Sequence, residues 1–381
     1  MSAWRQAAQA QQARRLEQHL LRTPSVLAGP QQVETQINGQ SVINFSSNDY
    51  LGWAGDPQMA EWLNQGGRQH GVGSGASHWV VGHNQAHEAL ENSIKQWLGV
   101  ESVALFATGY LANLAAISAL GADCAVHQDR LNHASLLQAG QLCASSRRFA
   151  HGDVQQLTQR LASATTRCLV VSDGVFSMDG DVAPVQALVQ ACEQHDALLM
   201  IDDAHGFGVL GDAGRGCTQG LAVPLVMGTL GKAIGAGGAF VAGDADYVEW
   251  IRQGAKPYTY TTALSPALAF VASRAIERLQ NEPEHQAKLS ANIAYFTGAC
   301  QQAGIELLPS NSAVQACVLG DNQRALRISS QLRQQGLWVA AIRPPTVPQG
   351  TARLRIALSA AHHKTHLDTL VERLAQCLGK S

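Results

Sequence analysis

The sequence predicts an α/β protein with a mostly parallel sheet flanked by helices, followed by a smaller α+β unit. Short apolar runs recur between residues 102 and 243, most of them separated by helical stretches, as in a parallel sheet covered on both faces. Polar residues follow several of these runs, where open α/β sheets bind their ligands. After Pro266 the alternation gives way to a long helical region and then to shorter mixed elements.

The amino-terminal part predicts a helix and a hairpin. Residues 1–22 carry a loose helical stripe that stops before Pro24, so we expect a helix lying on the body of the protein. Asn38 and Gly39 separate two strand-like runs, and they indicate a hairpin because both tolerate positive φ. The next expected elements are a helix at 56–70, a glycine-rich loop at 71–82 and a helix at 84–98.

Six apolar runs of strand length define the expected sheet: 102–106, 123–126, 168–172, 198–202, 224–228 and 238–243. Beyond them we expect helical structure to about residue 304, a helix near 322–335, strand-like runs in LWVAAI and RLRIALS, and a final helix at 363–378. The predicted units are an amino-terminal helix and hairpin segment (1–52), a large α/β domain (53–284) and a carboxyl-terminal α+β domain (285–381).

Composition narrows the class of protein. The 381 residues are 46% hydrophobic, which is enough for a substantial core. A formal charge of -2 argues against nucleic acid or an anionic membrane as the main partner, so small-molecule substrates are expected. The eight cysteines form no CxxC pair, which favours free thiols in a cytoplasmic protein over disulfides or a metal site. There is no hydrophobic signal core and no apolar run near the ~20 residues that span a bilayer.

Lys232 and Asp202 are the main catalytic candidates. Asp202 ends the apolar run LLMID, and Lys232 lies among glycines about one strand later. An aspartate for a pyridinium nitrogen and a lysine for a Schiff base are the pair that pyridoxal phosphate chemistry needs. Taken singly, an Asp-Asp pair at a strand end that is followed by a glycine is commonly a turn, and a lone lysine is usually a solvated charge. Lys232, however, is the one of six lysines in a glycine-rich apolar context, where desolvation favours the neutral amine.

Other polar groups follow strand ends as well. Gly109 and Tyr110 open a helix whose amides face an incoming anion, although one glycine is also typical of a turn. Further candidates at or just beyond strand ends are His133, Ser177, His205 and Thr229. The ordinary interpretation of His133 is a surface or capping residue, and that of Ser177 is a turn residue. Their shared position predicts one pocket that collects them.

Near the carboxyl end, strand alternation places Arg353 and Arg355 on one face. An arginine in this position offers a planar fork to the carboxylate of an amino acid. A solvated strand face explains the same pattern equally well.

The motifs NFSSNDYLG, RLNHASLLQAG, DGVFSMDGD, IDDAHGFGVLG and IRPPTVPQGTARLRI resemble those of the α-oxoamine synthases, nearly end to end. These are fold-type I pyridoxal phosphate (PLP) transferases with a seven-stranded-type sheet. The resemblance implies that Lys232 bonds the cofactor, Asp202 pairs with the pyridine nitrogen, His133 stacks on the ring, and His205 and Ser177 lie at its phenolic oxygen. It assigns the phosphate or ring to Gly109, Tyr110, Thr229 and Thr262 of the neighbouring subunit, and the substrate side to Arg22, Asn48, His133, Thr351 and Arg355.

The same resemblance implies a homodimer with shared active sites and a reaction that joins an amino acid to an acyl thioester. The motifs favour L-alanine and a pimeloyl thioester, carried on coenzyme A or on an acyl carrier protein. The alternatives are glycine with another acyl-CoA, an aminotransferase of the same fold, and a binding protein that retains the fold without the activity. Two departures, SHWVVG at 77–82 and Ala263 in place of a common serine, concern the thioester channel or the partner's phosphate contact.

Overall fold

The computed structural model describes residues 2–18, 20–21 and 23–379. Its centre is a seven-stranded sheet in the order β4-β10-β9-β8-β7-β5-β6. The strands are β4 (Ser102–Phe106), β5 (Ala125–Asp129), β6 (Ser145–Phe149), β7 (Cys168–Asp173), β8 (Leu198–Asp202), β9 (Leu225–Thr229) and β10 (Ala239–Gly243). Six strands point the same way and β10 alone runs against its neighbours, so the prediction of a mostly parallel sheet is confirmed.

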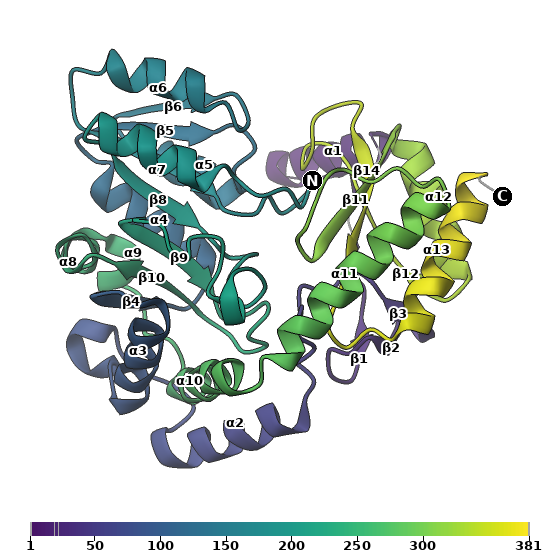
Figure 1. Ribbon diagram of the computed structural model, residues 1–381, viewed down its shortest axis with the longest axis horizontal. Helices are drawn as coiled ribbons and strands as arrows, with labels where there is room; N and C mark the ends of the chain where they lie inside the picture. The colour runs from purple at the N-terminus through teal and green to yellow at the C-terminus, as the bar shows by residue number, and fades with distance from the viewer. Residues whose placement is uncertain (1, 19, 22, 380–381) are drawn as a thin grey trace.

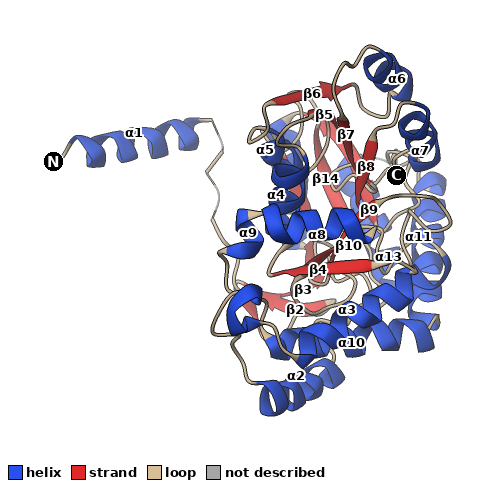
Figure 2. Ribbon diagram, turned by 90° about the vertical axis from the view of Figure 1, so that its left-hand side faces the viewer, coloured by secondary structure: helices blue, strands red, loops and turns tan. Residues whose placement is uncertain are grey.

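Helices cover both faces of this sheet (Figures 1 and 2). They are α2 (Pro57–His70), α3 (Gln85–Leu98), α4 (Gly109–Leu120), α5 (Ala134–Gly140), α6 (Val154–Ala162), α7 (Val185–Gln194), α8 (Ala245–Gly254), α9 (Lys256–Thr259) and α10 (Pro266–Asn281). Alternate strand residues separate into the two cores: Val171 and Met200 pack toward α4 and α8, whereas Val170 and Leu199 pack toward α6 and α7. This division follows from the period-2 alternation of strand side chains.

Two smaller sheets form the second unit (Figure 1). One has the order β11-β14-β13 and the other the order β1-β2-β3-β12. Their elements are β1 (Leu27–Ala28), β2 (Glu34–Ile37), β3 (Gln40–Asn44), α11 (Glu284–Gln302), β11 (Val314–Gly320), α12 (Asn322–Gln334), β12 (Leu337–Trp338), β13 (Ala340–Ile342), β14 (Ala352–Ala357) and α13 (Lys364–Leu378). Asn38 and Gly39 have φ of 52° and 78°, which confirms the hairpin. The hairpin belongs to the same sheet as a carboxyl-terminal strand, because β3 pairs with β12. The predicted domain bounds stay a prediction.

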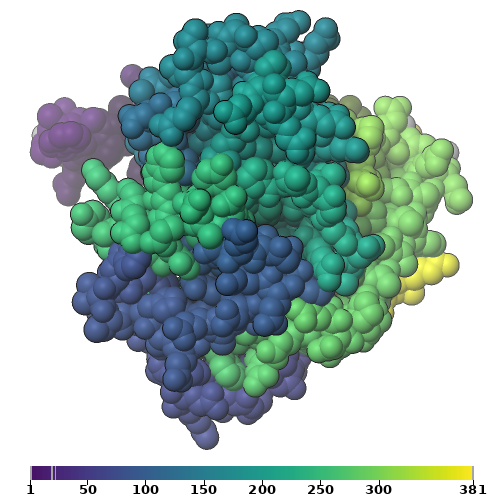
Figure 3. All heavy atoms as spheres, turned by 60° about the vertical axis from the view of Figure 1, so that its left-hand side comes forward, coloured from purple at the N-terminus to yellow at the C-terminus, as the bar shows by residue number. Residues whose placement is uncertain are grey.

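The amino-terminal helix differs from the expectation. α1 (Ala3–Glu17) buries no residue, and it stands clear of the body in Figures 2 and 3. Its thin apolar stripe leaves Trp4 87% exposed and Leu16 63% exposed. The expectation that this helix lies on the body of its own chain is therefore wrong.

Two further differences concern the sheet and the surface. β6 begins Ser-Ser-Arg-Arg and escaped prediction, because an edge strand that is exposed on both sides lacks an apolar run. The strand expected at 123–126 lies at Ala125–Asp129 instead. None of the helices within the described ranges is long and apolar enough to cross a membrane.

Candidate active site

The carboxyl ends of the parallel strands open into one small cavity of about 170 Å³. Eight predicted residues line it: Gly109, Tyr110, His133, Ser177, Asp202, His205, Thr229 and Lys232. Five others that the sequence analysis gave no role also line it: Asn113, Ser135, Asp173, Ala204 and Met227. The predicted convergence of polar strand-end groups is thus found in the structure.

Asp202 is the buried anion of the cavity. It ends β8 and is 4% exposed, and its Oδ1 accepts a hydrogen bond of 3.0 Å from the Ala204 amide. Its Oδ2 accepts a hydrogen bond of 2.7 Å from Asn113 Nδ2. Both carboxylate oxygens of Asp202 are therefore held by hydrogen-bond donors.

His133 belongs to the same hydrogen-bond network. Asn113 Nδ2 also donates to Ser135 Oγ at 2.9 Å, and Ser135 Oγ lies 2.7 Å from His133 Nδ1. The Ser135 amide approaches the same Nδ1 at 3.3 Å. We assign Nδ1 as the acceptor of both, which leaves the proton of the neutral ring on Nε2. Burial lowers the pKa of His133, and Lys232 lowers it further while Asp202 opposes the shift.

Asp173 is a second buried carboxyl beside Asp202. The register of β7 and β8 pairs these two residues directly. Burial and the neighbouring Asp202 raise the pKa of Asp173 well above its usual range. Asp173 Oδ2 accepts a hydrogen bond of 2.7 Å from the His133 amide, so this carboxyl positions the start of α5. The sequence did not predict a role for Asp173, because an aspartate at the end of the run CLVVSD resembles an ordinary strand end.

Lys232 lies in the turn that joins β9 to β10. Its carbonyl accepts a hydrogen bond of 2.9 Å from the Gly235 amide, and Gly235 has φ of 69°. A Cβ on Gly235 would stand 2.7 Å from the Ala54 amide nitrogen, so this close approach needs glycine. Burial lowers the pKa of Lys232 to about 8, although Asp202 and Asp173 oppose the shift. The neutral amine is therefore far more populated near neutral pH than it is for an ordinary lysine.

His205 is connected through Tyr50 to the segment that follows β3. Its Nδ1 lies 2.6 Å from the Tyr50 hydroxyl, and burial raises the pKa of Tyr50. Burial, with Lys232 and Arg355 as nearby cations, lowers the pKa of His205 well below its usual range. We assign the phenol proton to this contact, so that the neutral ring carries its own proton on Nε2.

Arg355 and Asn48 do not line the cavity, but Arg355 contacts the segment that carries Ser177. Its Nε donates a hydrogen bond of 2.6 Å to the Ser177 carbonyl, and a terminal nitrogen donates to Asn48 Oδ1 at 3.0 Å. Arg353 lies on the same face of β14 as predicted, but it is paired with Asp179. Thr351 donates to the Pro348 carbonyl at 2.7 Å and does not line the cavity. Arg22 lies outside the described residues.

The end of the cavity nearest to α4 suits an anion. α4 begins at Gly109 after the N-cap Thr108, so its first amides lack helical acceptors. The Thr229 hydroxyl accepts from the Gly231 amide at 3.4 Å and donates to the Gly238 carbonyl at 3.2 Å. Thr262 is exposed and does not line this cavity of its own chain.

These groups fit PLP. A buried carboxylate at a strand end suits a ring nitrogen, a desolvated lysine suits an aldehyde, and a helix amino terminus suits a phosphate. The fit rests on the set of donors around one cavity, with the lysine and the carboxylate both present.

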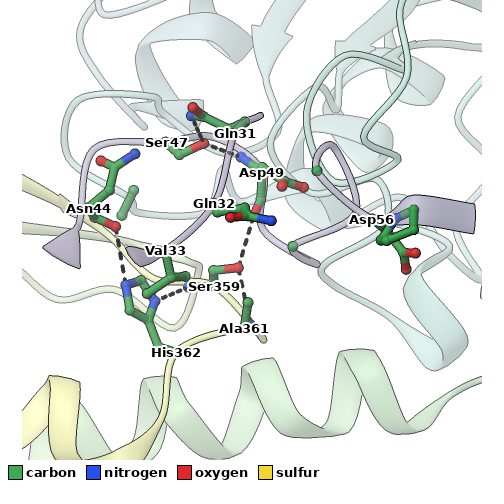
Figure 4. A pocket seen from close by; sticks show the side chains of 14 residues that line it. Gln31, Gln32, Val33, Asn44, Ser47, Asp49, Asp56, Ser359, Ala361 and His362 are labelled. Carbon is green, nitrogen blue, oxygen red and sulfur yellow. Dashed lines mark hydrogen bonds between the residues drawn. The ribbon is translucent and has the colours of Figure 1, made fainter. Parts of the chain in front are cut away.

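A second pocket, of about 270 Å³, lies behind residues 47–50 (Figure 4). Ser47 and Asp49 line it, whereas the intervening Asn48 and the following Tyr50 bind Arg355 and His205 on the active-site side. Its polar groups bond to one another: the Ser359 hydroxyl donates to the Asp49 carbonyl at 2.9 Å, and Asp49 accepts from backbone amides. We interpret this network as the support that holds residues 47–50 against the active site.

Comparison with known proteins identifies relatives over nearly the whole chain. Residues 40–374 match the family model of the class I and II aminotransferases. An 8-amino-7-oxononanoate synthase of Marinomonas sp. is 47% identical over 96% of this chain and 93% of its own length. One of Methylobacillus flagellatus is 48% identical over 98% of this chain and 95% of its own.

Solved structures show the same architecture. A serine palmitoyltransferase of S. paucimobilis with a bound PLP–myriocin aldimine superposes with a TM-score of 0.91 at 29% identity, covering 97% of this chain and 96% of its own. An 8-amino-7-oxononanoate synthase from Francisella tularensis has a TM-score of 0.77 at 26% identity, covering 89% and 98%. The predicted fold-type I architecture is confirmed.

Proposed function

The chain belongs to the class I and II aminotransferase family, and from that premise we propose that it condenses L-alanine with a pimeloyl thioester in biotin biosynthesis. The products are 8-amino-7-oxononanoate, carbon dioxide and the free thiol. The chain is a PLP-dependent acyltransferase, like the relatives that cover 96% of it. The observation that carries the proposal is the single cavity in which Lys232, Asp202, His133 and His205 meet.

Lys232 and Asp202 carry the central roles in this proposal. Bound PLP supplies an electron sink for the negative charge that develops at the substrate Cα. Lys232 Nζ accepts the Cα proton, because its lowered pKa makes the neutral amine available. The Asp202 carboxylate holds a proton on the ring nitrogen, and Asn113 orients that carboxylate.

His133 and His205 act at opposite ends of the hydrogen-bond network. His133 Nε2–H would return a proton after carbon dioxide leaves, and the contact of Ser135 with Nδ1 supports the tautomer that this requires. His205 Nε2–H and Ser177 would hold the phenolic oxygen of bound PLP, and Tyr50 holds the His205 ring. Gly109, Tyr110 and Thr229 would hold its phosphate.

The substrate carboxylate binds to Arg355. Asn48 already holds this guanidinium in place, and a planar fork matches a carboxylate. Thr351 and Arg22 are proposed on the substrate side by family resemblance alone.

We also propose a homodimer with shared active sites. Thr262 is exposed beside an apolar surface formed by Val72, Trp79, Val80, Val81 and Tyr260, which are 46–81% exposed. A second copy would cover this surface and bring its own Thr262 to the phosphate. The exposed helix α1 is available for contact with the same partner.

The acyl donor and the compartment are finer proposals. Coenzyme A or an acyl carrier protein would present the pimeloyl group to the cavity. A cytoplasmic location agrees with eight free cysteines, of which five are buried.

The second candidate keeps the chemistry and changes the substrates to glycine or another amino acid with a different acyl-CoA. The 29% identity to a serine palmitoyltransferase supports the shared fold, while 47% identity to 8-amino-7-oxononanoate synthases favours alanine and the pimeloyl donor.

Isotope tracing distinguishes condensation from transamination. L-Alanine labelled with ¹³C in its carboxylate should release labelled carbon dioxide and yield unlabelled 8-amino-7-oxononanoate by mass spectrometry. Labelled pyruvate without thiol release would indicate an aminotransferase instead.

A further inference from the structure

His151 lies between two carboxylates outside the cavity. Its Nδ1 is 3.2 Å from both oxygens of Asp129, and its Nε2 is 2.9 Å from Asp181 Oδ2. The ring packs edge-on against Phe176, with the ring centroids 4.4 Å apart at 88°. Both ring nitrogens thus face acceptors, so the doubly protonated cation satisfies the site best.

The two carboxylates belong to separate segments of the chain, and each segment leads to a residue of the cavity. Asp129 ends β5, its Oδ1 accepts from the Leu131 amide at 2.8 Å, and its carbonyl accepts from the Asn132 amide at 3.2 Å. These bonds shape the turn that delivers His133 to the cavity.

Asp181 belongs to the loop that delivers Ser177. Its carbonyl accepts a hydrogen bond of 3.0 Å from the Phe176 amide, and the adjoining residues Val175 and Val182 form an isolated bridge. Ser177 follows directly after this closure and lines the cavity. The side chain of Asp181 therefore holds the base of a loop whose tip is a cofactor-side residue.

We propose that His151 is a positioning residue: by bridging Asp129 and Asp181, it sets the separation between His133 and Ser177 on the cofactor. The inference rests on the proposed function, because it assumes that both residues contact PLP. His151, Asp129 and Asp181 do not line the cavity, so any effect on the cofactor passes through the two loops.

The electrostatics agree with the geometry. Hydrogen bonds to Asp129 and then to Asp181 raise the pKa of His151 to about 9, against the cost of burial. Asp129 and Asp181 are the charged groups that shift this pKa in the described part of the chain. The bridge is thus closed at neutral pH, and its side chains are 25% (His151), 2% (Asp129) and 31% (Asp181) exposed.

The test titrates apoprotein with PLP and measures the dissociation constant by fluorescence. The thermal unfolding temperature of the apoprotein is measured in parallel. In His151→Gln one neutral amide replaces a cation that reaches both carboxylates. We expect PLP affinity to fall roughly tenfold, about the effect of one charge-assisted hydrogen bond. The matched control is His366→Gln in α13, which breaks a histidine–carboxylate pair of 2.9 Å with Glu34 of β2 and should leave PLP affinity unchanged.

Asp181→Asn provides a second route, because it keeps the contact between His151 and Asp129 and weakens only the Ser177 side. It should also lower PLP affinity, and the double variant should lose less than the sum of the two single changes. Unchanged PLP affinity in both single variants, with lowered unfolding temperature alone, would overturn the inference and make the bridge purely structural. Failure of the unaltered protein to bind PLP would instead contradict the proposed function.

Discussion

The Asn113 side-chain amide donates to Asp202 Oδ2 at 2.7 Å and, through its second hydrogen, to Ser135 Oγ at 2.9 Å. One buried residue of α4 thereby links the proposed ring-nitrogen partner to the network that fixes His133. Asn113 is 1% exposed, so its hydrogen bonds are made within the folded protein and not at the surface.

Asn113→Leu should keep the fold and impair the site. The substitution preserves volume but removes a donor to a buried carboxylate, a loss of about 1.5–3 kcal/mol of interaction. We expect kcat to fall at least tenfold while the far-ultraviolet circular dichroism spectrum is retained. Wild-type turnover in this variant would show that Asp202 needs no such orientation.

Lys232→Ala should abolish turnover, because the base that accepts the Cα proton is removed. PLP should still bind, through the phosphate and ring contacts, but without the covalent bond to the protein. Borohydride reduction followed by peptide mapping should label Lys232 in the unaltered protein and no residue in the variant. Normal turnover by the variant would defeat the assignment.

Asp202→Asn should retain PLP while losing most of the turnover, since a neutral amide cannot hold the proton on the ring nitrogen. The expected loss of kcat is on the order of a hundredfold or more, as for other groups that stabilise developing charge. The check is a comparison of kcat with the PLP dissociation constant. An equal loss of kcat and of PLP affinity would point to a purely structural role for Asp202.

The stability of the apoprotein should depend on the Lys232 charge. Because burial lowers its pKa to about 8 in the folded state, below the ordinary value of 10.5, the unfolded chain binds more protons between these pH values. The loss of folding stability caused by the buried Lys232 charge is fully present below pH 8 and disappears as pH rises toward 10.5. Lys232→Met apoprotein should therefore be more stable at pH 7 by on the order of 2 kcal/mol, with the difference vanishing near pH 10.5. Urea unfolding at both pH values measures it, and an equal difference at the two would contradict the assignment.

Arg355→Lys should raise KM for L-alanine roughly tenfold or more, because an ammonium loses the planar fork. Arg353→Lys is the matched control on the same strand face: Arg353 pairs with Asp179, whereas Arg355 donates to the Ser177 carbonyl and to Asn48 beside the cavity. Steady-state kinetics should separate the two, and a comparable rise in KM for both variants would argue against a specific carboxylate contact.

Strand periodicity and strand-end polarity carried most of the prediction. They located the sheet, the hairpin at Asn38-Gly39 and eight of the cavity residues, because buried strands and turns each follow local rules of composition. β6 escaped because its Ser-Ser-Arg-Arg run is that of an exposed edge. The position of α1 depends on contacts outside its own sequence. Its apolar stripe therefore led to the wrong prediction that the helix packs on the body of the protein.

The site residues that were not predicted from the sequence are those whose roles arise from tertiary contacts. Asn113 lies inside an apolar helix, and the raised pKa of Asp173 arises from burial in the folded sheet and from Asp202, which β8 places beside it. Tyr50 lay within a recognised motif, but its bond to His205 joins residues 155 positions apart. Local sequence holds no signal for such pairings.

The most direct test of the proposed function is free-thiol release by the PLP-loaded protein, with pimeloyl-CoA and acetyl-CoA each offered alongside L-alanine or glycine. We predict release that requires both L-alanine and pimeloyl-CoA. Release only with glycine and acetyl-CoA, or none with any pair, would contradict the proposed condensation.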